Sequence, residues 1–424
     1  MTTLIRGGPA AKRWIASAAM GLCLAGPTLA QPAPPAAESD LVAQGRYLAT
    51  LGGCGDCHTA KAGAYAGGRP FESPMGAVVS ANITPDPETG IGAWNADDFY
   101  RALHEGKSRK VGHLYPAFPY PHFTQITRSD ADALFAFLRS QPPVTNDPKR
   151  DQLSFPLNIR ATMAFWNGLF FHKGTFQPDA RRDAQWNRGA YVVEALAHCS
   201  ACHSPKNALQ AEVRSKVFQG GDVEGWFAPN LTPEPRTGLG RWSQQDIVDF
   251  LKTGRNSRTV AGGPMAGVVM GSTSHMRDED LQAIAAYLTT LPASPPAPQA
   301  PHIDAAAVQR GGAVFTANCS RCHGDQGGGG RGPALDGDAI VQAEQPSTIL
   351  HYIVSGTKAP ATANQSGGQS GGAQMPAFGQ RLDDGQIADV ASYIRGAWTN
   401  RAASVTSGAV AKLRAKAQAQ AGPS

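Results

Sequence analysis

The pentapeptide Cys-x-x-Cys-His occurs three times in this 424-residue chain and constrains its fold more than any other feature. The copies are Cys54–His58, Cys199–His203 and Cys319–His323. In such a motif the two thiols can add to the two vinyl groups of a haem, and the adjacent histidine supplies an axial ligand to the iron. Each copy therefore predicts a point where the chain folds around a large, flat cofactor.

The use of cysteine supports haem attachment at every copy. Six of the seven cysteines belong to the motifs: Cys54, Cys57, Cys199, Cys202, Cys319 and Cys322. The first axial ligands are then His58, His203 and His323. A zinc or dithiol-redox site also uses Cys-x-x-Cys, but zinc sites need paired knuckles close in sequence, and these copies begin 145 and 120 residues apart. We therefore expect three covalently bound haem c groups, each with its iron.

The first 30 residues have the pattern of a secretory signal peptide. Three basic residues precede an apolar run over 14–24, and the sequence Thr-Leu-Ala ends at Ala30. The run is shorter than the ~20 apolar residues that a membrane span needs. The seventh cysteine, Cys23, lies in this segment, so cleavage leaves only the motif cysteines. Cleavage also lowers the formal net charge from +5 to +2, which gives no electrostatic case for binding nucleic acid or an anionic membrane surface. We expect a periplasmic protein.

An internal repeat and changes in composition divide the remaining chain. Asn82–Trp94 and Asn230–Trp242 share the pattern Asn-x-Thr-Pro-x-Pro-x-Thr-Gly-x-Gly-x-Trp, which the last third of the chain lacks. The expected divisions are a first domain over 39–141, a bridge over 142–180, a second domain over 181–291, a Pro/Ala linker over 292–301, a third domain over 302–400 and a tail over 401–424. We expect the tail to be frayed, with a weak surface helix as the alternative.

Each expected domain begins with a helix that leads into its motif and ends with an amphipathic helix. Asp and Ser residues before 133–138, 281–288 and 387–394 are good helix-start signals for the closing helices. Small residues in the leading helices, at Gly45, Gly189 and Gly312, would let another helix approach closely. Two such helices meeting over a haem are the plan of a small cytochrome c. The predicted fold class is therefore all-α, with three tandem cytochrome c-like haem domains.

The sixth iron ligand should lie in the loop before each closing helix. Met375, in a Met-Pro pair, fits this place in the third domain. In the second domain we favour Met265, because it aligns with the repeat, over its rivals Met270 and Met276. A methionine thioether raises the haem potential relative to a second histidine.

The first domain breaks this pattern, because its equivalent position is Phe118, which cannot bind iron. We favour His122, four residues later, which would give a bis-histidine haem of lower potential. His113 is the next candidate, and an open five-coordinate iron is the third. An open iron would allow a haem enzyme, which is one alternative function for the chain.

Several segments resemble the triheme cytochrome c subunits of bacterial membrane-associated periplasmic dehydrogenases, which serve alcohol, gluconate, sorbitol or fructose, and aldehyde dehydrogenases. The resemblance rests on the haem motifs and on residues 82–94, 114–120, 165–167, 186–191 and 228–232. It implies an electron-transfer subunit that accepts electrons from a dehydrogenase catalytic subunit containing molybdenum, flavin or a quinone cofactor. No substrate-oxidising site is then expected in this chain.

The same resemblance implies that electrons pass from haem to haem to ubiquinone or a terminal oxidase at the outer face of the inner membrane, with peripheral membrane association. The sequence Phe-Pro-Tyr-Pro-His at 118–122 resembles the cytochromes that accompany molybdenum hydroxylases of the aldehyde, nicotinate or isoquinoline type. A free periplasmic electron shuttle is the other alternative.

Three further features fit a haem protein of this kind. The small-cytochrome pattern implies that the backbone carbonyls of Ala81, Pro229 and Pro333 accept a hydrogen bond from Nδ1 of the motif histidines. Three arginines, Arg69, Arg241 and Arg331, either pair with haem propionates or are solvated surface residues. The apolar stretch Met163–Phe171 either packs into the core or docks to a partner or a bilayer surface.

Overall fold

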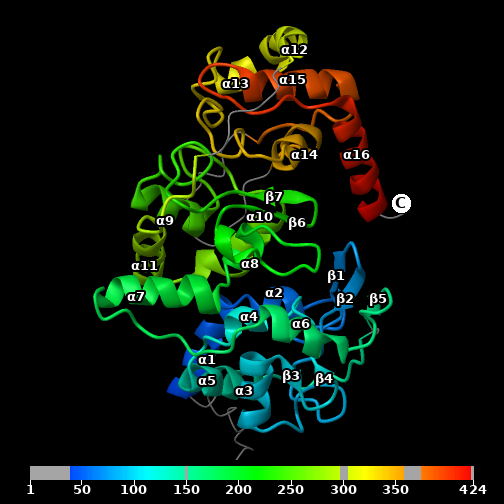
Figure 1. Ribbon diagram of the computed structural model, residues 1–424, viewed down its shortest axis with the longest axis vertical. Helices are drawn as coiled ribbons and strands as arrows, with labels where there is room; N and C mark the ends of the chain where they lie inside the picture. The colour runs from blue at the N-terminus through cyan, green and yellow to red at the C-terminus, as the bar shows by residue number, and fades with distance from the viewer. Residues whose placement is uncertain (1–38, 149–150, 297–303, 358–373, 422–424) are drawn as a thin grey trace, which may run out of the picture. The chain divides into compact units, whose positions relative to one another are not determined.

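Three pairs of crossing helices organise the chain in a computed structural model, which describes residues 39–148, 151–296, 304–357 and 374–421 (Figure 1). The pairs are α1 Asp40–Leu51 with α5 Arg128–Arg139, α7 Ala184–Tyr191 with α11 Asp278–Leu288, and α12 Ala305–Asn318 with α15 Asp384–Gly396. The predicted signal peptide, Cys23 and residues 297–301 of the predicted linker lie outside the described residues. We call residues 39–141 the first repeat, 181–291 the second repeat and the chain from 304 onward the third segment.

The same glycine contact closes each helix pair. A Cβ atom built on Gly45, Gly189 or Gly311 would lie 1.9–2.0 Å from a backbone oxygen of the closing helix, that of Ala133, Ala283 or Asp389. An aromatic residue four positions later, Phe137, Tyr287 or Tyr393, packs on the same glycine. Only a residue without a side chain permits this approach.

Two of the three predicted crossing glycines are confirmed, and the third is wrong by one residue. Gly45 and Gly189 lie at the crossings, but in the third segment Gly311 does so. A Cβ atom on the predicted Gly312 would meet only the ring edge of Tyr393, at 3.3 Å. The two adjacent glycines are equivalent in composition, so only the rotation of the helix separates them.

A short motif helix follows each leading helix, and a middle helix follows later. The motif helices are α2 Cys54–His58, α8 Ser200–His203 and α13 Ser320–His323, and the middle helices are α3 Ala96–Glu105, α9 Gln244–Thr253 and α14 Ser347–Ser355. Each middle helix ends at a glycine with positive φ: Gly106 (61°), Gly254 (73°) or Gly356 (72°). Positive φ costs glycine nothing, so these residues stop the helices cleanly.

Short antiparallel strands and small helices fill the loops. A hairpin follows the motif in each repeat: β1 Pro70–Ser73 with β2 Gly76–Val79, and β6 Gly221–Val223 with β7 Trp226–Ala228. The remaining elements are β3 Lys107–Ser108, β4 Gly112–His113, α4 Tyr120–Phe123, β5 Gln152–Leu153, α6 Thr162–Phe170, η1 Val192–Leu196, η2 Arg214–Lys216, α10 Gly263–Gly271, η3 Thr273–His275 and α16 Ser407–Ala421. The fold is therefore mainly helical, as predicted.

The two repeats share one hydrophobic core, whereas the third segment has its own. Leu48 and Phe137 of the first repeat belong to the same buried cluster as Val193 and Leu288 of the second. A separate cluster in the third segment contains Phe315, Ile353, Ile387 and Ile394. A small third cluster joins Tyr120 to Met163 and Trp166 of α6.

The chain beyond each closing helix returns to the Asn-x-Thr-Pro segment of its own repeat. The side-chain amide of Asn82 donates to the carbonyl of Val144 at 2.7 Å, and that of Asn230 donates to the hydroxyl of Ser294 at 2.9 Å. Both acceptors lie three residues beyond the predicted domain ends at 141 and 291. The repeated asparagine therefore ties the start of each connecting segment to its domain.

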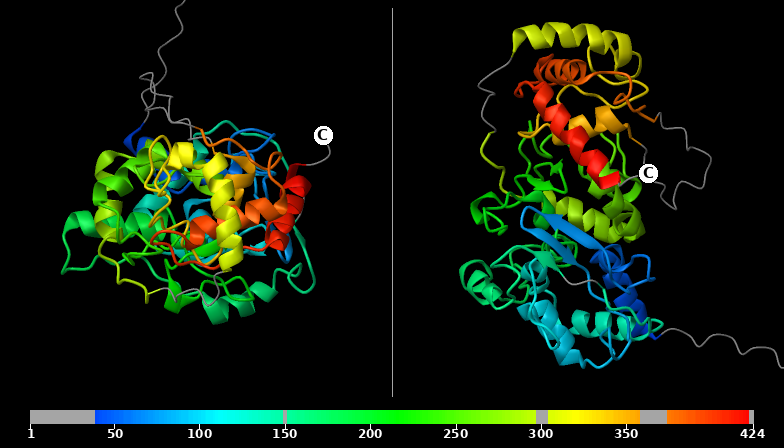
Figure 2. Two further views of the ribbon diagram at one scale, coloured as in Figure 1. Left: turned by 90° about the horizontal axis from the view of Figure 1, so that it is seen from above. Right: turned by 90° about the vertical axis from the view of Figure 1, so that its right-hand side faces the viewer.

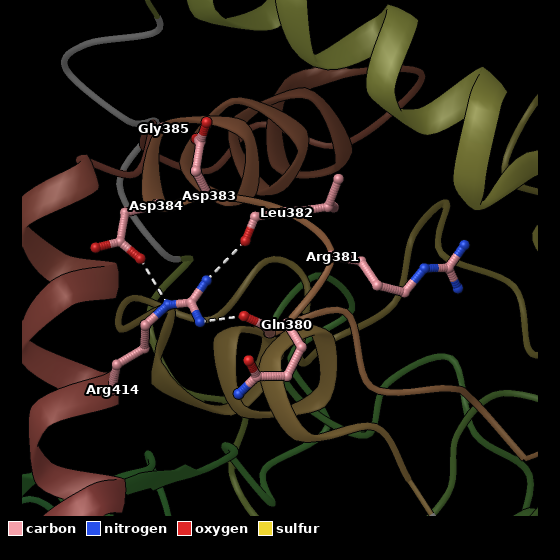
Figure 3. A pocket seen from close by; sticks show the side chains of 8 residues that line it. Gln380, Arg381, Leu382, Asp383, Asp384, Gly385 and Arg414 are labelled. Atoms are coloured by element: carbon pink, nitrogen blue, oxygen red, sulfur yellow. Dashed lines mark hydrogen bonds and ion pairs between the residues drawn. The ribbon is translucent and has the colours of Figure 1, made fainter.

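The C-terminal residues form a packed helix, so the expected frayed tail is wrong for residues 407–416. Val410 of α16 is fully buried, and Leu413 is 9% exposed, in the cluster of the third segment. Figure 2 shows α16, in red, beside α15 and α14, which it contacts. The guanidinium of Arg414 bonds the carbonyls of Gly379 and Leu382 and pairs with Asp384 at 2.6 Å (Figure 3). These tertiary contacts order a segment whose alanine-rich composition suggested none.

Among the described residues, no helix combines the length and the apolar character needed to cross a membrane.

Candidate haem-attachment sites

The motif cysteines are unpaired thiols of intermediate exposure. Burial is the largest influence on the ionisation of four of them, and it raises the pKa of Cys54 and Cys199 to about 12 and that of Cys57 and Cys319 to about 11. A neutral thiol in an apolar setting suits a position that is covered by a cofactor.

Each motif histidine makes the same hydrogen bond, as predicted. Nδ1 lies 2.7 Å from the carbonyl oxygen of Ala81 for His58, 2.7 Å from that of Pro229 for His203, and 2.8 Å from that of Pro333 for His323. Because a carbonyl can only accept, Nδ1 must carry the proton, and Nε2 keeps its lone pair for a metal. Burial also lowers the pKa of all three imidazoles, which keeps them neutral. These residues therefore fit haem ligation.

The segments that carry the expected sixth ligands can be aligned through one backbone hydrogen bond. The expectation that these ligands lie in loops is wrong for His122, which lies in α4, and for Met265, which lies in the first turn of α10. Leu114 N–H donates to the carbonyl of Gly106 at 2.8 Å, and Ala261 N–H donates to that of Gly254 at 2.7 Å. Both acceptors are the glycines that end the middle helices. Four residues after each donor stand Phe118 and Met265. The structure therefore places Met265 at the position that Phe118 occupies in the first repeat.

The rival methionines of the second repeat have other places. Met276 is 1% exposed in the shared core and directly precedes the N-cap of α11, just as the buried Ile126 precedes the N-cap of α5. Met270 is 46% exposed. In the third segment, the carbonyl of Met375 accepts from Thr357 N–H at 3.0 Å, directly after the glycine that ends α14. Met375 therefore occupies the corresponding loop.

The position in the sequence does not decide between His122 and His113 as the sixth ligand in the first repeat. Nε2 of His122 lies 2.6 Å from Oε1 of Glu212, a residue of the second repeat, so this nitrogen is already engaged. Nδ1 of His113 is buried and has no hydrogen-bond partner among the described residues. Ligation by His122 stays a prediction, and the unpartnered nitrogen gives His113 structural support that its sequence position lacked.

The two repeats pack their ligand loops against each other's motifs. In the first repeat, α4 contacts η1, which leads into Cys199, and its Phe123 packs edge-on against His198 at 5.4 Å. In the second, α10 contacts α2, where a Cβ on Gly271 would lie 1.9 Å from Asp56 Oδ1. Burial lowers the pKa of His198 to about 4, so it packs as a neutral side chain. The first two motifs are therefore neighbours in space.

A reciprocal pair of hydrogen bonds, which the sequence reasoning missed, holds this arrangement. The hydroxyl of Tyr47 donates to Asp280 Oδ2 at 2.6 Å, and that of Tyr191 donates to Asp130 Oδ2 at 2.7 Å. A signal was present: each tyrosine lies two residues after a crossing glycine, and each aspartate lies three residues after a helix N-cap. The internal repeat therefore predicts the pair of bonds, once the two repeats are assumed to face each other.

The candidate propionate-binding arginines mostly contact the protein. Arg69 donates to the carbonyl of Asp56 at 2.7 Å and lies 3.8 Å from Glu224. Arg241 reaches the carbonyl of Gly337 at 3.4 Å, and Arg331 is exposed. Their pairing with propionates stays a prediction.

Comparison with known proteins identifies similar chains. A family model described as cytochrome c matches residues 187–292 and 308–398, which contain the second and third motifs but not the first. One subunit of the nicotinate dehydrogenase of Pseudomonas putida is 41% identical over 369 residues; the match covers 84% of this chain but only 30% of that protein, so the chain spans less than a third of it.

Two further relatives match over nearly their whole length. The gluconate 2-dehydrogenase cytochrome c subunit of Pantoea cypripedii is 39% identical over 404 residues, which cover 89% of this chain and 90% of the relative. The cytochrome c subunit of the quinone alcohol dehydrogenase of Gluconacetobacter polyoxogenes is 38% identical over 421 residues, which cover 94% of this chain and 89% of the relative.

Proposed function

Because the chain belongs to the family of cytochrome c subunits of dehydrogenases, we propose that it carries three haems and relays electrons from a catalytic subunit to a quinone or a terminal oxidase. Membership makes the chain an electron-transfer subunit with covalently bound haem c. The number of haems, their ligands, the particular partner and the location are our proposals.

The observation that carries the count of three is the repeated hydrogen bond of the motif histidines. Each donates from Nδ1 to a backbone carbonyl at 2.7–2.8 Å, including His58, which lies outside the matched family model. A bound haem supplies one-electron chemistry at its iron. The chain anchors it through two cysteines, orients the axial histidine through that carbonyl, and sets its potential through the sixth ligand and burial. We propose one haem domain for each helix pair, with α16 included in the third.

Haem counting tests this proposal. Intact mass and a pyridine haemochrome assay should give three covalent haems on a chain that begins at Gln31. Replacing both cysteines of the first motif, Cys54→Ala and Cys57→Ala, should remove one haem and leave the other two. Two haems on the wild-type chain would contradict the count of three.

We propose His122 as the sixth ligand of the first haem, with His113 as the alternative that its buried, unpartnered nitrogen supports. Electron paramagnetic resonance of the ferric protein separates the two. His122→Ala should convert one low-spin bis-histidine signal to high spin, whereas His113→Ala should not. The reverse result would assign His113. If neither variant changes the spectrum and the ferrous wild type binds carbon monoxide at one haem, the first iron is open.

We further propose a molybdenum hydroxylase as the catalytic partner. The similarity to a nicotinate dehydrogenase subunit and the Phe-Pro-Tyr-Pro-His variant at 118–122 support this choice. The tagged chain, purified gently from its native cells, should retain a subunit that contains molybdenum by elemental analysis. Retention of a flavin or quinone cofactor instead would assign the partner to the sugar and alcohol dehydrogenases.

We propose a periplasmic location with attachment to the membrane surface through α6. The apolar stretch of the bridge, Met163–Phe171, has both buried and exposed side chains. Met163 and Trp166 are buried, as core packing predicts, whereas Phe165 is 71% and Leu169 51% exposed. The nearby Phe155 is 79% exposed, and no carboxylate occurs over residues 152–178. Such an exposed apolar face suits the surface of a lipid bilayer. The wild type should co-sediment with phosphatidylglycerol vesicles, and the double variant Phe165→Ser, Leu169→Ser should not.

A further inference from the structure

Two aromatic rings occupy the space beside the glycines that precede Met265. A Cβ atom built on Gly262 would lie 2.3 Å from Cε1 of Tyr352, and one on Gly263 would lie 2.3 Å from Cε2 of Trp226. Trp226 lies on β7 of the second repeat, whereas Tyr352 lies on α14 of the third segment. The two glycines form a notch, which we call the Gly262–Gly263 notch, and a side chain from the third segment fills it.

Several contacts fix Tyr352 in this notch. Its hydroxyl donates to the carbonyl of Val260 at 2.8 Å, and its ring meets Trp226 at 5.7 Å and 63°. One helical turn earlier, the hydroxyl of Thr348 donates to the carbonyl of Phe227 at 2.8 Å and accepts from its N–H at 3.0 Å. His351 stacks on Trp226 at 4.2 Å and 9°. One face of α14 therefore contacts both the β6–β7 hairpin and the loop that precedes α10 in the second repeat.

The first repeat shows that the notch is a special feature of the second. By the backbone alignment above, Gly262 and Gly263 correspond to Tyr115 and Pro116. Tyr115 is 6% exposed, and its hydroxyl donates to the carbonyl of Leu157 at 2.6 Å. The first repeat thus has a buried tyrosine of its own at the aligned position, whereas the second has a glycine there and receives a tyrosine from the third segment.

The same helix reaches the other methionine loop. α14 ends at Gly356, and the next residue, Thr357, donates its N–H to the carbonyl of Met375 at 3.0 Å. α14 therefore contacts the start of α10, the helix that carries Met265, through Tyr352, and it adjoins the segment of Met375 at its own C-terminal end.

We propose that Tyr352 is a positioning residue for Met265, so that the sixth ligand of the second haem is held in place by the third segment. This inference rests on the proposed ligation by Met265. Without the ring in the notch, the two glycines at the start of α10 would be free to take other conformations, and the thioether of Met265, in the first turn of that helix, would no longer be held at one place.

The test uses the full chain with its haems. Methionine bound to ferric haem gives a weak charge-transfer absorption band in the red. Met265→Ala should remove the part of the band intensity that one of the two methionine-ligated haems contributes. Tyr352→Ala should reduce the same contribution and lower one midpoint potential, because loss of methionine lowers the potential of a haem. Tyr352→Phe, which keeps the ring and loses only the hydroxyl, should largely preserve both. Gly262→Ala, whose methyl group displaces the ring, should resemble Tyr352→Ala.

The matched control is Tyr115→Phe, which removes the equivalent hydroxyl in the first repeat and should leave the methionine band unchanged. Circular dichroism and haem content establish that each variant is folded. If Met265→Ala leaves the band intact, the proposed ligand is wrong. A second outcome would overturn the positioning role of Tyr352 but keep Met265 as the ligand. In it, Met265→Ala reduces the band intensity, whereas the folded variants Tyr352→Ala and Gly262→Ala keep the full band and all midpoint potentials.

Discussion

At the scale of single residues, two adjacent glycines should respond in opposite ways to the same substitution. Gly311→Ala should destabilise the third segment by about 1–3 kcal/mol or more, because the new methyl group would overlap the backbone oxygen of Asp389. Gly312→Ala should be neutral or stabilise it by up to about 1 kcal/mol, since alanine favours a helix and only the edge of Tyr393 is near. Urea unfolding of both variants checks this. Equal destabilisation would show that the crossing is not set by Gly311.

Asp280 should make a contribution to stability that depends on pH. Burial alone would raise the pKa of its carboxyl, but hydrogen bonds from Arg188 and Tyr47 lower it below the ordinary value. A lowered pKa stabilises the fold above the unfolded pKa of about 4, and this contribution is lost as the pH falls through the lower folded value. Asp280→Asn should therefore cost about 1–3 kcal/mol at neutral pH and less in acid.

Urea unfolding at neutral and acidic pH checks the prediction for Asp280. Asp278→Asn is the matched control, because its side chain lies in the same helical turn but is 71% exposed. A stability difference between wild type and Asp280→Asn that is independent of pH would contradict the role of the charged carboxylate.

The residues that could be predicted are those that the resemblance to small cytochromes identifies. The carbonyl partners of the motif histidines lie 23, 26 and 10 residues beyond them, so spacing alone does not identify Ala81, Pro229 and Pro333, but that resemblance does. The partner of His122 could not be predicted, because Glu212 is 90 residues away and reaches it only through the packing of two repeats.

At the scale of elements, α16 should carry measurable stability despite its composition. Leu413→Ala should destabilise the third segment by about 2–5 kcal/mol, because it empties a place in the cluster around Phe315 and Ile394. Lys412→Ala, at an exposed position of the same helix, should change little. Thermal unfolding measures both. If Leu413→Ala leaves the unfolding temperature unchanged, α16 is not packed in solution.

The elements show why sequence predicts helices better than their packing. The middle helices α3, α9 and α14 were not predicted. Asp and Ser residues near helix starts, such as Asp383 before α15, are local signals, and the closing helices α5, α11 and α15 were expected from them. α16 was not, because Val410 and Leu413 are sparse apolar residues in an alanine-rich run. Their role depends on α14 and α15, which lie beside them only in the folded chain.

At the scale of the whole molecule, the division of the core predicts two unfolding events. The repeats share one buried cluster, while the third segment has another. Calorimetry should therefore resolve two transitions, with Gly189→Ala lowering one and Leu413→Ala lowering the other. A single transition that shifts in both variants would show that contacts such as that of Tyr352 couple the two cores fully.

The three haem-attachment sites differ in their proposed sixth ligand, so the three haems should have different midpoint potentials. Phe118 stands where the second repeat has Met265, so the first haem should titrate at the lowest potential, and the two methionine-ligated haems should titrate higher. Phe118→Met introduces the repeat's own ligand at this position. It should raise the lowest midpoint potential, because a thioether then competes with the histidine for the sixth position.

Spectroelectrochemical titration with the methionine charge-transfer band as a second readout tests this substitution. Phe118→Leu is the control: it changes the packing against Phe123, 5.4 Å away, in a similar way but offers no ligand. If both variants raise the potential equally, packing rather than ligation controls it. If Phe118→Met alone raises the potential and adds to the band, replacement of this one methionine by phenylalanine is sufficient to set the first haem apart. Electrons that pass through the chain would then meet haems of unlike potential, which gives the transfer a direction.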